Sequence, residues 1–147
     1  MCESRRTDHI LATVVFAFRC EPGVPEVECD PEQLRQVLLN LCINAMQAAK
    51  GGGEVEITAA ARGPAAIITV ADNGPGMLPE VAGRIFEPFF TTKPDGTGLG
   101  LAVARTIIEG HGGRIWLEPN VPRGVRFHIE LPVTQKESTD ERIHTDR

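Results

Sequence analysis

Two amide side chains are spaced so that they could bind a phosphorylated ligand together. Asn40 and Asn44 are four residues apart in a segment with helical periodicity, so both lie on one face of that helix. A buried amide without a partner costs free energy, and its oxygen can complete the shell of a hydrated cation such as Mg²⁺. The pair therefore indicates a cation or phosphate site. The alternative is that both amides bond only to backbone or solvent.

A carboxylate follows an apolar segment and precedes a glycine-rich turn. Asp72 is followed by Asn73-Gly74-Pro75-Gly76. The carboxylate can accept a hydrogen bond from an exocyclic amine such as that of adenine, and glycines allow a planar ring to approach the backbone. An ordinary Asp-Asn-Gly turn is the alternative.

A second glycine cluster, Gly96-Thr97-Gly98-Leu99-Gly100, opens a predicted helix. Backbone N–H groups at a helix N-terminus attract phosphate, and glycines let it come close. Leu101 and Val103 occupy positions where G-x-G-x-x-G requires glycine, and no P-loop motif occurs. The pattern therefore indicates phosphate binding outside the dinucleotide folds, the P-loop proteins and the Ser/Thr/Tyr kinases.

Between the two clusters lies an aromatic segment, Phe86 to Lys93. Aromatic residues in an irregular, glycine-flanked stretch indicate a cover that packs in one state and swings away in another. Lys93 could then reach a terminal phosphate. The alternative is a simple aromatic anchor with a solvated Lys93.

Composition narrows the function classes. Fifteen Lys and Arg residues against twenty Asp and Glu residues give a net charge of -5, which argues against a nucleic-acid binder. No apolar run approaches the ~20 residues that span a bilayer, so we expect no direct membrane contact. The four cysteines lack C-x-x-C spacing, and free thiols fit a cytoplasmic setting. The histidines show no metal-like grouping and no paired acid, so we expect no catalytic histidine.

Periodicity and turn signals outline one domain over residues 10–133, with polar tails at 1–9 and 134–147. We expect the first tail to be frayed. Asp30 can cap a long helix from Pro31, and Arg126, His128 and Glu130 are expected to face solvent from the last strand. The order of elements favours an α+β fold with helices on one face of a mixed sheet. The expected strands are 10–18, 54–61, 65–71, 114–118 and 124–132, and the other expected helices are 78–84 and 98–109.

In their order and spacing, four motifs resemble the ATP-binding catalytic domain of bacterial sensor histidine kinases. That family belongs with the gyrase, heat-shock chaperone and mismatch-repair ATPases. The resemblance implies a Bergerat-type two-layer α/β sandwich with a mostly antiparallel sheet and a flexible lid over ATP. The F box resembles the nitrogen-regulator type in particular. The motifs are the N box (residues 30–48), the first glycine box (DNGPGM, 72–77), the F box (FEPFFTTK, 86–93) and the second glycine box (residues 96–113).

The resemblance also implies residue roles. Asn44 would coordinate Mg²⁺, Asn40 would lie beside the phosphates, Asp72 would bind the adenine amine, and Lys93 would assist from the lid; Asn40, Asn44 and Lys93 are the implied catalytic residues. Many relatives carry a basic residue where this chain has Gln47, so Lys93 or Arg105 is expected to replace it. The other implied ATP contacts are Gln47, Ala48, Gly74, Gly76, Met77, Phe89, Thr92, Gly96, Thr97, Gly98, Leu99, Gly100 and Leu101.

The implied reaction moves the γ-phosphoryl group of Mg·ATP to a histidine on a separate dimerisation hairpin, with a response regulator downstream. His9 fits a strand and lacks the H-E-x-x-[NR]-P context, so we expect the acceptor outside this chain, residues 1–9 to be a linker remnant, and the isolated domain to be monomeric. The parent protein is compatible with a membrane anchor. Two alternatives remain. A superfamily ATPase would favour Glu at position 40, and a degenerate binding module would not need Asn44, Asp72 and both glycine boxes.

Overall fold

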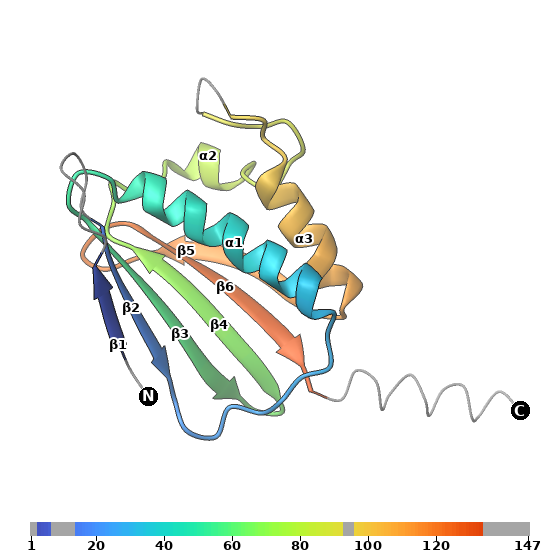
Figure 1. The fold of residues 1–147 in the computed structure, drawn as a ribbon. Helices are drawn as coiled ribbons and strands as arrows, with labels where there is room; N and C mark the ends of the chain where they lie inside the picture. The colour runs from blue at the N-terminus through green and yellow to red at the C-terminus, as the bar shows by residue number, and fades with distance from the viewer. Residues whose placement is uncertain (1–2, 7–13, 93–95, 134–147) are drawn as a thin grey trace, which may run out of the picture.

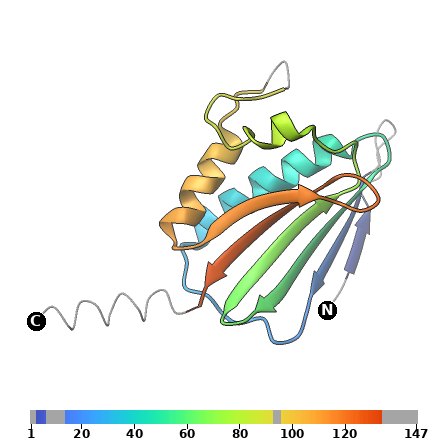
Figure 2. The same ribbon diagram turned by 180° about the vertical axis from the view of Figure 1, so that it is seen from behind.

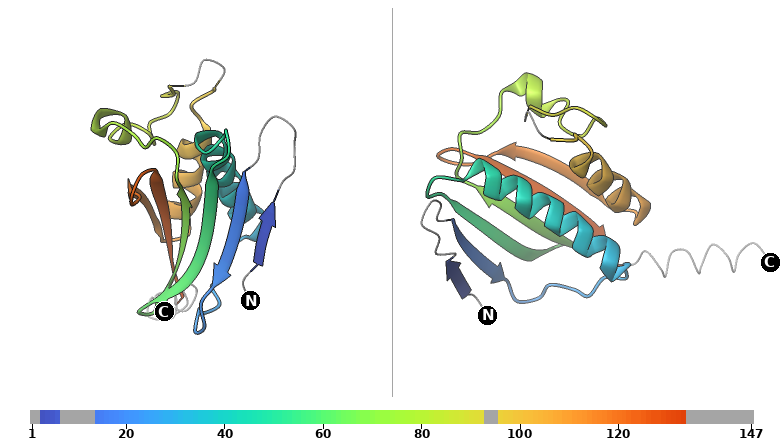
Figure 3. Two further views of the ribbon diagram at one scale, coloured as in Figure 1. Left: turned by 90° about the vertical axis from the view of Figure 1, so that its left-hand side faces the viewer. Right: turned by 45° about the horizontal axis from the view of Figure 1, so that its top comes forward.

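The computed structural model describes residues 3–6, 14–92 and 96–133, which form two layers. A six-stranded sheet of order β1-β2-β3-β4-β6-β5 forms one layer, and α1 and α3 lie side by side on one of its faces (Figures 1 and 3). Seen from behind, the other face carries no helix (Figure 2). The elements are β1 (Glu3–Arg6), β2 (Val15–Cys20), α1 (Pro31–Ala48), β3 (Glu54–Arg62), β4 (Ala65–Asp72), α2 (Pro79–Ala82), α3 (Gly100–Gly110), β5 (Arg114–Pro119) and β6 (Val125–Pro132).

The sheet is mixed but mostly antiparallel, as expected for the α+β class. Only the β2–β3 pair is parallel among the described strands, and α1 lies on the connection between them. The hairpin of β3 and β4 closes at the Arg62–Ala65 pair, where Gly63 has a φ of 58°. A positive φ is readily adopted by glycine, which explains the tight turn at this position.

The long helix begins where its capping residue predicts. The Oδ1 atom of Asp30 accepts hydrogen bonds from the backbone N–H groups of Glu32 (2.9 Å) and Gln33 (3.3 Å). Val37, Leu41 and Ala45 follow at four-residue spacing and are fully buried against the sheet. This apolar stripe holds α1 on the sheet and therefore sets the direction of the opposite, polar face.

The two long helices are also joined by a histidine. His111 follows α3 and accepts the backbone N–H of Asp30 at its Nε2 atom (3.0 Å), while its Nδ1 atom contacts the carbonyl oxygen of Ile107 (2.8 Å). His111 therefore links the residue that caps α1 to the end of α3. No described helix is long and apolar enough to cross a membrane.

The structure corrects several expected boundaries and environments. Residues 3–6 form β1, which pairs with β2, so the prediction of a frayed N-terminal tail is wrong for them. The strand expected from residue 10 begins at Val15, and residues 10–13 and the tail 134–147 lie outside the described residues. The expected helix 98–109 starts at Gly100 because Gly98 has a φ of 74°. His128 was expected in solvent but is buried.

Candidate functional site

A cavity of about 430 Å³ lies between α1, residues 96–98 with the start of α3, and the segment of residues 76–92. Its volume is in the range of small-molecule sites. Figure 1 shows this segment, including α2, at the end of the helical layer where α3 begins. Of the residues predicted to bind ATP, those in the cavity wall are Asn40, Asn44, Gln47, Ala48, Gly76, Met77, Thr92, Gly96, Thr97, Gly98, Gly100 and Leu101.

Four predicted residues are absent from the wall, namely Asp72, Gly74, Phe89 and Leu99, and Lys93 lies outside the described residues. Five others complete the wall without having been predicted: Ile43, Val81, Ile85, Phe90 and Thr91. Ile43 lies three residues after Asn40, so helical spacing could have identified it. Val81 lies in α2 and Ile85 follows it four residues later, so helical spacing relates these two as well, whereas Phe90 and Thr91 lie in an irregular segment without a periodic signal.

Asn40 connects the two helices beside the cavity. Its Nδ2 atom donates a hydrogen bond to the backbone carbonyl oxygen of Gly100 (2.9 Å), and its Oδ1 atom accepts one from Nε2 of Gln36 (3.2 Å). The amide of Asn40 therefore bonds to a distant backbone carbonyl and to a second side chain, and its role beside the phosphates stays a prediction. The backbone partner is 60 residues away and belongs to the other helix, so the bond fixes α3 relative to α1.

The N-terminus of α3 opens on the cavity through glycines. Gly98 has a φ of 74°, and a Cβ atom there would lie 2.5 Å from the carbonyl carbon of Phe89. The backbone N–H of Phe89 donates to the carbonyl oxygen of Gly98 (2.8 Å), so the loop at Phe89 directly contacts the loop that precedes α3. No acidic side chain occupies the first turn of α3. The helix N-terminus is therefore available to an anionic ligand.

Asp72 ends β4 and is only 2 % exposed. Its Oδ1 atom accepts a hydrogen bond from the backbone N–H of Gly74 (2.8 Å). Burial raises the pKa of this carboxyl group, while the amides of Gly74 and Val125 act in the opposite direction. The carboxylate is thus held in one orientation by its own turn.

Gly74 has a packing reason for being glycine. A Cβ atom at this position would lie 2.4 Å from the carbonyl oxygen of Ala48, the last residue of α1. The predicted close approach is therefore to a helix terminus, and Gly74 does not line the cavity. Gly76, with a φ of 88°, does line it.

The aromatic segment is anchored at one end and exposed at the middle. Phe86 packs edge-to-face on Phe127 of the core, with ring centroids 6.1 Å apart, whereas the Phe89 side chain is 75 % exposed. The guanidinium of Arg84 lies 4.5 Å from the centroid of the Phe90 ring. The anchor alternative thus holds for Phe86.

Arg105, expected as a phosphate contact, pairs with Glu109 (3.1 Å) and does not line the cavity.

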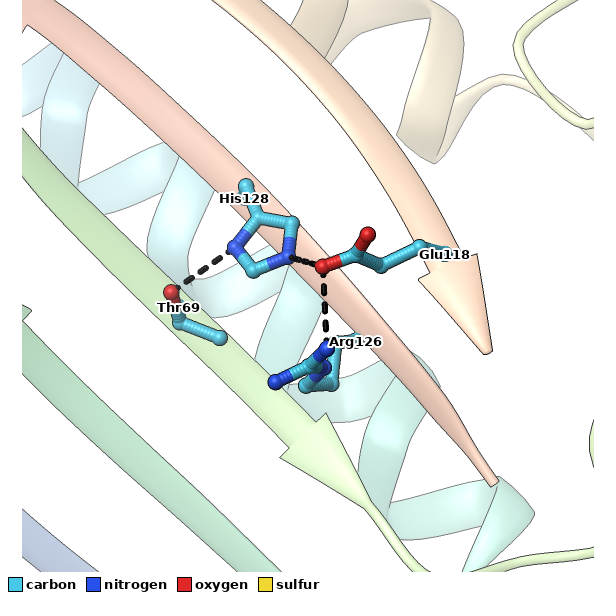
Figure 4. A network of polar contacts seen from close by, with 4 residues as sticks. All are labelled: Thr69, Glu118, Arg126 and His128. Carbon is cyan, nitrogen blue, oxygen red and sulfur yellow. Dashed lines mark hydrogen bonds and ion pairs between the residues drawn. The ribbon is translucent and has the colours of Figure 1, made fainter. Parts of the chain in front are cut away.

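A second polar cluster lies on the helix-free face of the sheet (Figure 4). Nε2 of His128 contacts Oε2 of Glu118 (2.8 Å), Nδ1 contacts Oγ1 of Thr69 (2.9 Å), and Arg126 pairs with the same Glu118 oxygen (3.0 Å). The hydrogen bond from His128 lowers the pKa of Glu118, and the charges of His128 and Arg126 act in the same direction. The expectation that no histidine has a paired acid is therefore wrong.

This cluster does not form a metal site. Among residues 3–6, 14–92 and 96–133, no three His, Cys, Asp or Glu side chains are grouped as metal ligands. The described cysteines, Cys20, Cys29 and Cys42, are all unbridged. Cys42 is half-buried, and burial raises the pKa of its thiol.

Comparison with known proteins gives consistent matches. Residues 29–135 match the family model described as histidine kinase-, DNA gyrase B-, and HSP90-like ATPase. The sensor histidine kinase ZraS of Escherichia coli O157:H7 is 45 % identical over 120 residues, which cover 82 % of this chain and 26 % of ZraS.

Solved structures agree with this match. The nucleotide-free catalytic domain of the histidine kinase ThkA is 41 % identical with a TM-score of 0.76, covering 84 % of this chain and 81 % of that one. ThkA in complex with the response regulator TrrA is 38 % identical with a TM-score of 0.68, covering 82 % of this chain and 35 % of that one. The chain spans about a quarter of the length of the curated relative.

Proposed function

Because this chain belongs to the histidine kinase-, DNA gyrase B- and HSP90-like ATPase family, we propose that it is the ATP-binding catalytic domain of a sensor histidine kinase. In that role it positions the γ-phosphoryl group of Mg·ATP for transfer to a histidine on a separate helical hairpin. The observation that carries the proposal is the joint wall of the cavity, in which the amides of α1 face the glycine-rich start of α3.

The phosphates occupy the side of the cavity formed by Gly96 to Gly100. The backbone N–H groups of the first turn of α3 bind the negatively charged phosphates there. Unlike a P-loop, this turn carries no lysine that contacts the phosphates. The bond from Asn40 to Gly100 keeps this turn in place before ligand arrives. Such pre-organisation contributes to phosphoryl transfer, which depends on positioning and charge stabilisation.

The residues present fit a magnesium ion that is held mainly by the nucleotide. Asn44 places an amide side chain in the wall, and no cluster of three acidic or histidine ligands occurs in the described part of the chain. One amide oxygen suffices when phosphate oxygens and water supply the other ligands. A bound Mg²⁺ would neutralise charge on the phosphates. Many relatives have a basic residue at the position of Gln47. We propose that Lys93 supplies the corresponding positive charge in this chain.

The base occupies the opposite side, near Gly76 and Met77. Asp72 is proposed to accept the adenine amine, directly and through water, from its buried position at the end of β4. Its single fixed orientation supports this role, because a positioned acceptor discriminates between an amine and a carbonyl on the base.

The proposed partners are a histidine-bearing dimerisation hairpin and a response regulator. The known complex of ThkA with TrrA supports the second. We propose that the isolated domain is monomeric and acts in the cytoplasm. The resemblance of the F box to the nitrogen-regulator type remains a prediction.

The experiment is a transfer assay with the cognate hairpin. The chain should label the hairpin from γ-labelled ATP in the presence of Mg²⁺, and a hairpin with its acceptor histidine changed to alanine should stay unlabelled. Removing Mg²⁺ with a chelator should abolish labelling. Release of inorganic phosphate at the same rate without any hairpin would instead support an ATPase.

A further inference from the structure

The turn between β5 and β6 lies against the segment that carries the proposed base contact. In the sheet, β6 runs antiparallel to β4, and Arg126 pairs with Ala71, so the turn at 120–124 adjoins the end of β4. Two of its side chains bond to the backbone there. Nδ2 of Asn120 donates to the carbonyl oxygen of Asp72 (2.8 Å), and Nε of Arg123 donates to the carbonyl oxygen of Gly74 (2.9 Å).

The turn is also in direct backbone contact with the same segment. A Cβ atom on Gly124 would lie 1.9 Å from the carbonyl oxygen of Asp72, and Gly124 has a φ of 107°. Any side chain at this position would push the turn away from Asp72. The backbone N–H of Asn120 donates to the carbonyl oxygen of Gly124 (2.9 Å), which closes the turn and holds both contacts together.

The other sides of the segment are restrained as well. The Oδ1 atom of Asn73 accepts the backbone N–H of Glu54 (2.8 Å), and Gly74 packs against the end of α1. The first contact is made by the segment's own side chain, Asn73, to the start of β3, and the second is backbone packing of Gly74 on the end of α1. The β5–β6 turn is therefore the side on which side chains from outside the segment bond directly to the backbone of Asp72 and Gly74.

We propose that Asn120 and Arg123 are positioning residues that set the selectivity of this chain for adenine over guanine. They act through the backbone of Asp72 and Gly74 and do not line the cavity. Selection by one hydrogen-bond acceptor requires that the acceptor be held to about 0.5 Å, and these two bonds hold it. The inference rests on the proposed function, because it assumes that Asp72 receives the base.

The first test compares ligands that do or do not contain the base. Calorimetry would give the dissociation constants of ATP, GTP and inorganic tripolyphosphate for the wild-type chain, Asn120→Ala and Arg123→Ala. Each variant should bind ATP about three- to tenfold more weakly, as expected for one lost hydrogen bond. Tripolyphosphate binding should stay within about twofold, and the preference for ATP over GTP should fall.

Val121→Ala is the matched control, because Val121 lies in the same turn and is 83 % exposed. It should behave like the wild-type chain, and Arg123→Lys should recover part of the ATP affinity because it retains a cationic donor. Equal loss of affinity for ATP and tripolyphosphate would overturn the proposal, as would unchanged ATP binding in both alanine variants.

The second test needs no nucleotide. The backbone N–H of Gly74 donates to Asp72, so its hydrogen exchange reports directly on this segment. Exchange should accelerate about tenfold or more in both alanine variants, with no change at Val70 in the central strand. If the wild-type chain binds neither nucleotide, the proposed function fails, and the exchange at Gly74 still decides whether the turn positions it.

Discussion

Asn40 donates a hydrogen bond to the carbonyl oxygen of Gly100, and this 2.9 Å contact joins α1 to the first turn of α3 beside the cavity. The amide belongs to the N box and the carbonyl to the second glycine box, 60 residues further along the chain. The bond makes the geometry of the helix N-terminus depend on the helix that carries Asn44. Both halves of the proposed phosphate site are therefore coupled in the protein before ligand binds.

Replacing Asn40 should weaken nucleotide binding more than it destabilises the fold. Asn40→Ala removes the hydrogen bonds to Gly100 and from Gln36, each worth about 1 kcal/mol, and leaves α3 less constrained. We expect roughly tenfold weaker ATP binding by calorimetry and a small decrease in melting temperature. Asn40→Asp should bind more weakly still, because a carboxylate cannot donate to Gly100 and repels phosphate.

Leu39→Ala is the control for this prediction. Leu39 is on the same helix, is 52 % exposed and does not line the cavity. Its ATP affinity should equal that of the wild-type chain. An Asn40→Ala variant that matches Leu39→Ala in affinity would remove Asn40 from the site.

Asp72→Asn should raise the melting temperature of the chain and at the same time lower its affinity for ATP. Burial raises the pKa of Asp72 above its ordinary 3.8, so the folded state favours the protonated form. The stability linked to that proton is present below pH 3.8 and is lost as the pH rises through the folded pKa. Asparagine cannot ionise, so the variant should gain melting temperature relative to the wild-type chain across this window.

The same variant should lose affinity for ATP. Asparagine has an NH2 group in place of one carboxylate oxygen, so a hydrogen-bond donor instead of an acceptor would face the adenine amine. For the wild-type chain, ATP binding should weaken as the pH falls through the folded pKa of Asp72. Calorimetry over a pH series measures both effects. An unchanged affinity in Asp72→Asn would exclude the proposed base contact.

Gly98→Ala should disrupt the contact between the aromatic segment at Phe89 and the start of α3. The added Cβ atom would lie 2.5 Å from the backbone of Phe89, and alanine disfavours a φ of 74°. We expect a loss of about 2 kcal/mol or more in the free energy of unfolding, together with weaker ATP binding. Chemical denaturation and calorimetry would measure the two quantities.

Gly110→Ala provides a matched comparison at the other end of the same helix. No atom lies within 4 Å of a Cβ atom placed there, and its φ is not positive. This variant should be neutral or more stable by up to about 1 kcal/mol, with unchanged ATP affinity. Similar destabilisation in both variants would mean that the conformation of Gly98 is not the cause.

Glu118→Gln should alter the acid limb of the stability profile. The pKa of Glu118 is lowered from 4.5 chiefly by its bond with His128, so its stabilising effect is present above pH 4.5 and is lost as the pH falls through the folded pKa. The variant should melt at a lower temperature at neutral pH and converge with the wild-type chain in acid. ATP affinity should not change, because Glu118 is outside the cavity wall. Parallel melting curves at every pH would contradict the predicted linkage.

Features that depend on neighbours in the sequence could be predicted without a structure. The start of α1 follows from Asp30 and Pro31, because capping is a contact with the next three residues. The β3–β4 hairpin and the buried alternation of β6 follow from local turn chemistry and periodicity. The glycine clusters indicated a phosphate site for the same reason, since helix N-termini attract anions wherever they occur.

Contacts between distant segments needed the tertiary structure. The pairing of His128 with Glu118 depends on the register of β5 and β6, which places His128 opposite Trp116 and so brings Glu118 within reach. The partner of Asn40 depends on how α1 and α3 pack, and the partner of the Asp72 carbonyl oxygen depends on the position of the β5–β6 turn. The sequence by itself determined which groups could bind a nucleotide, and packing and strand register decided which of them share one wall.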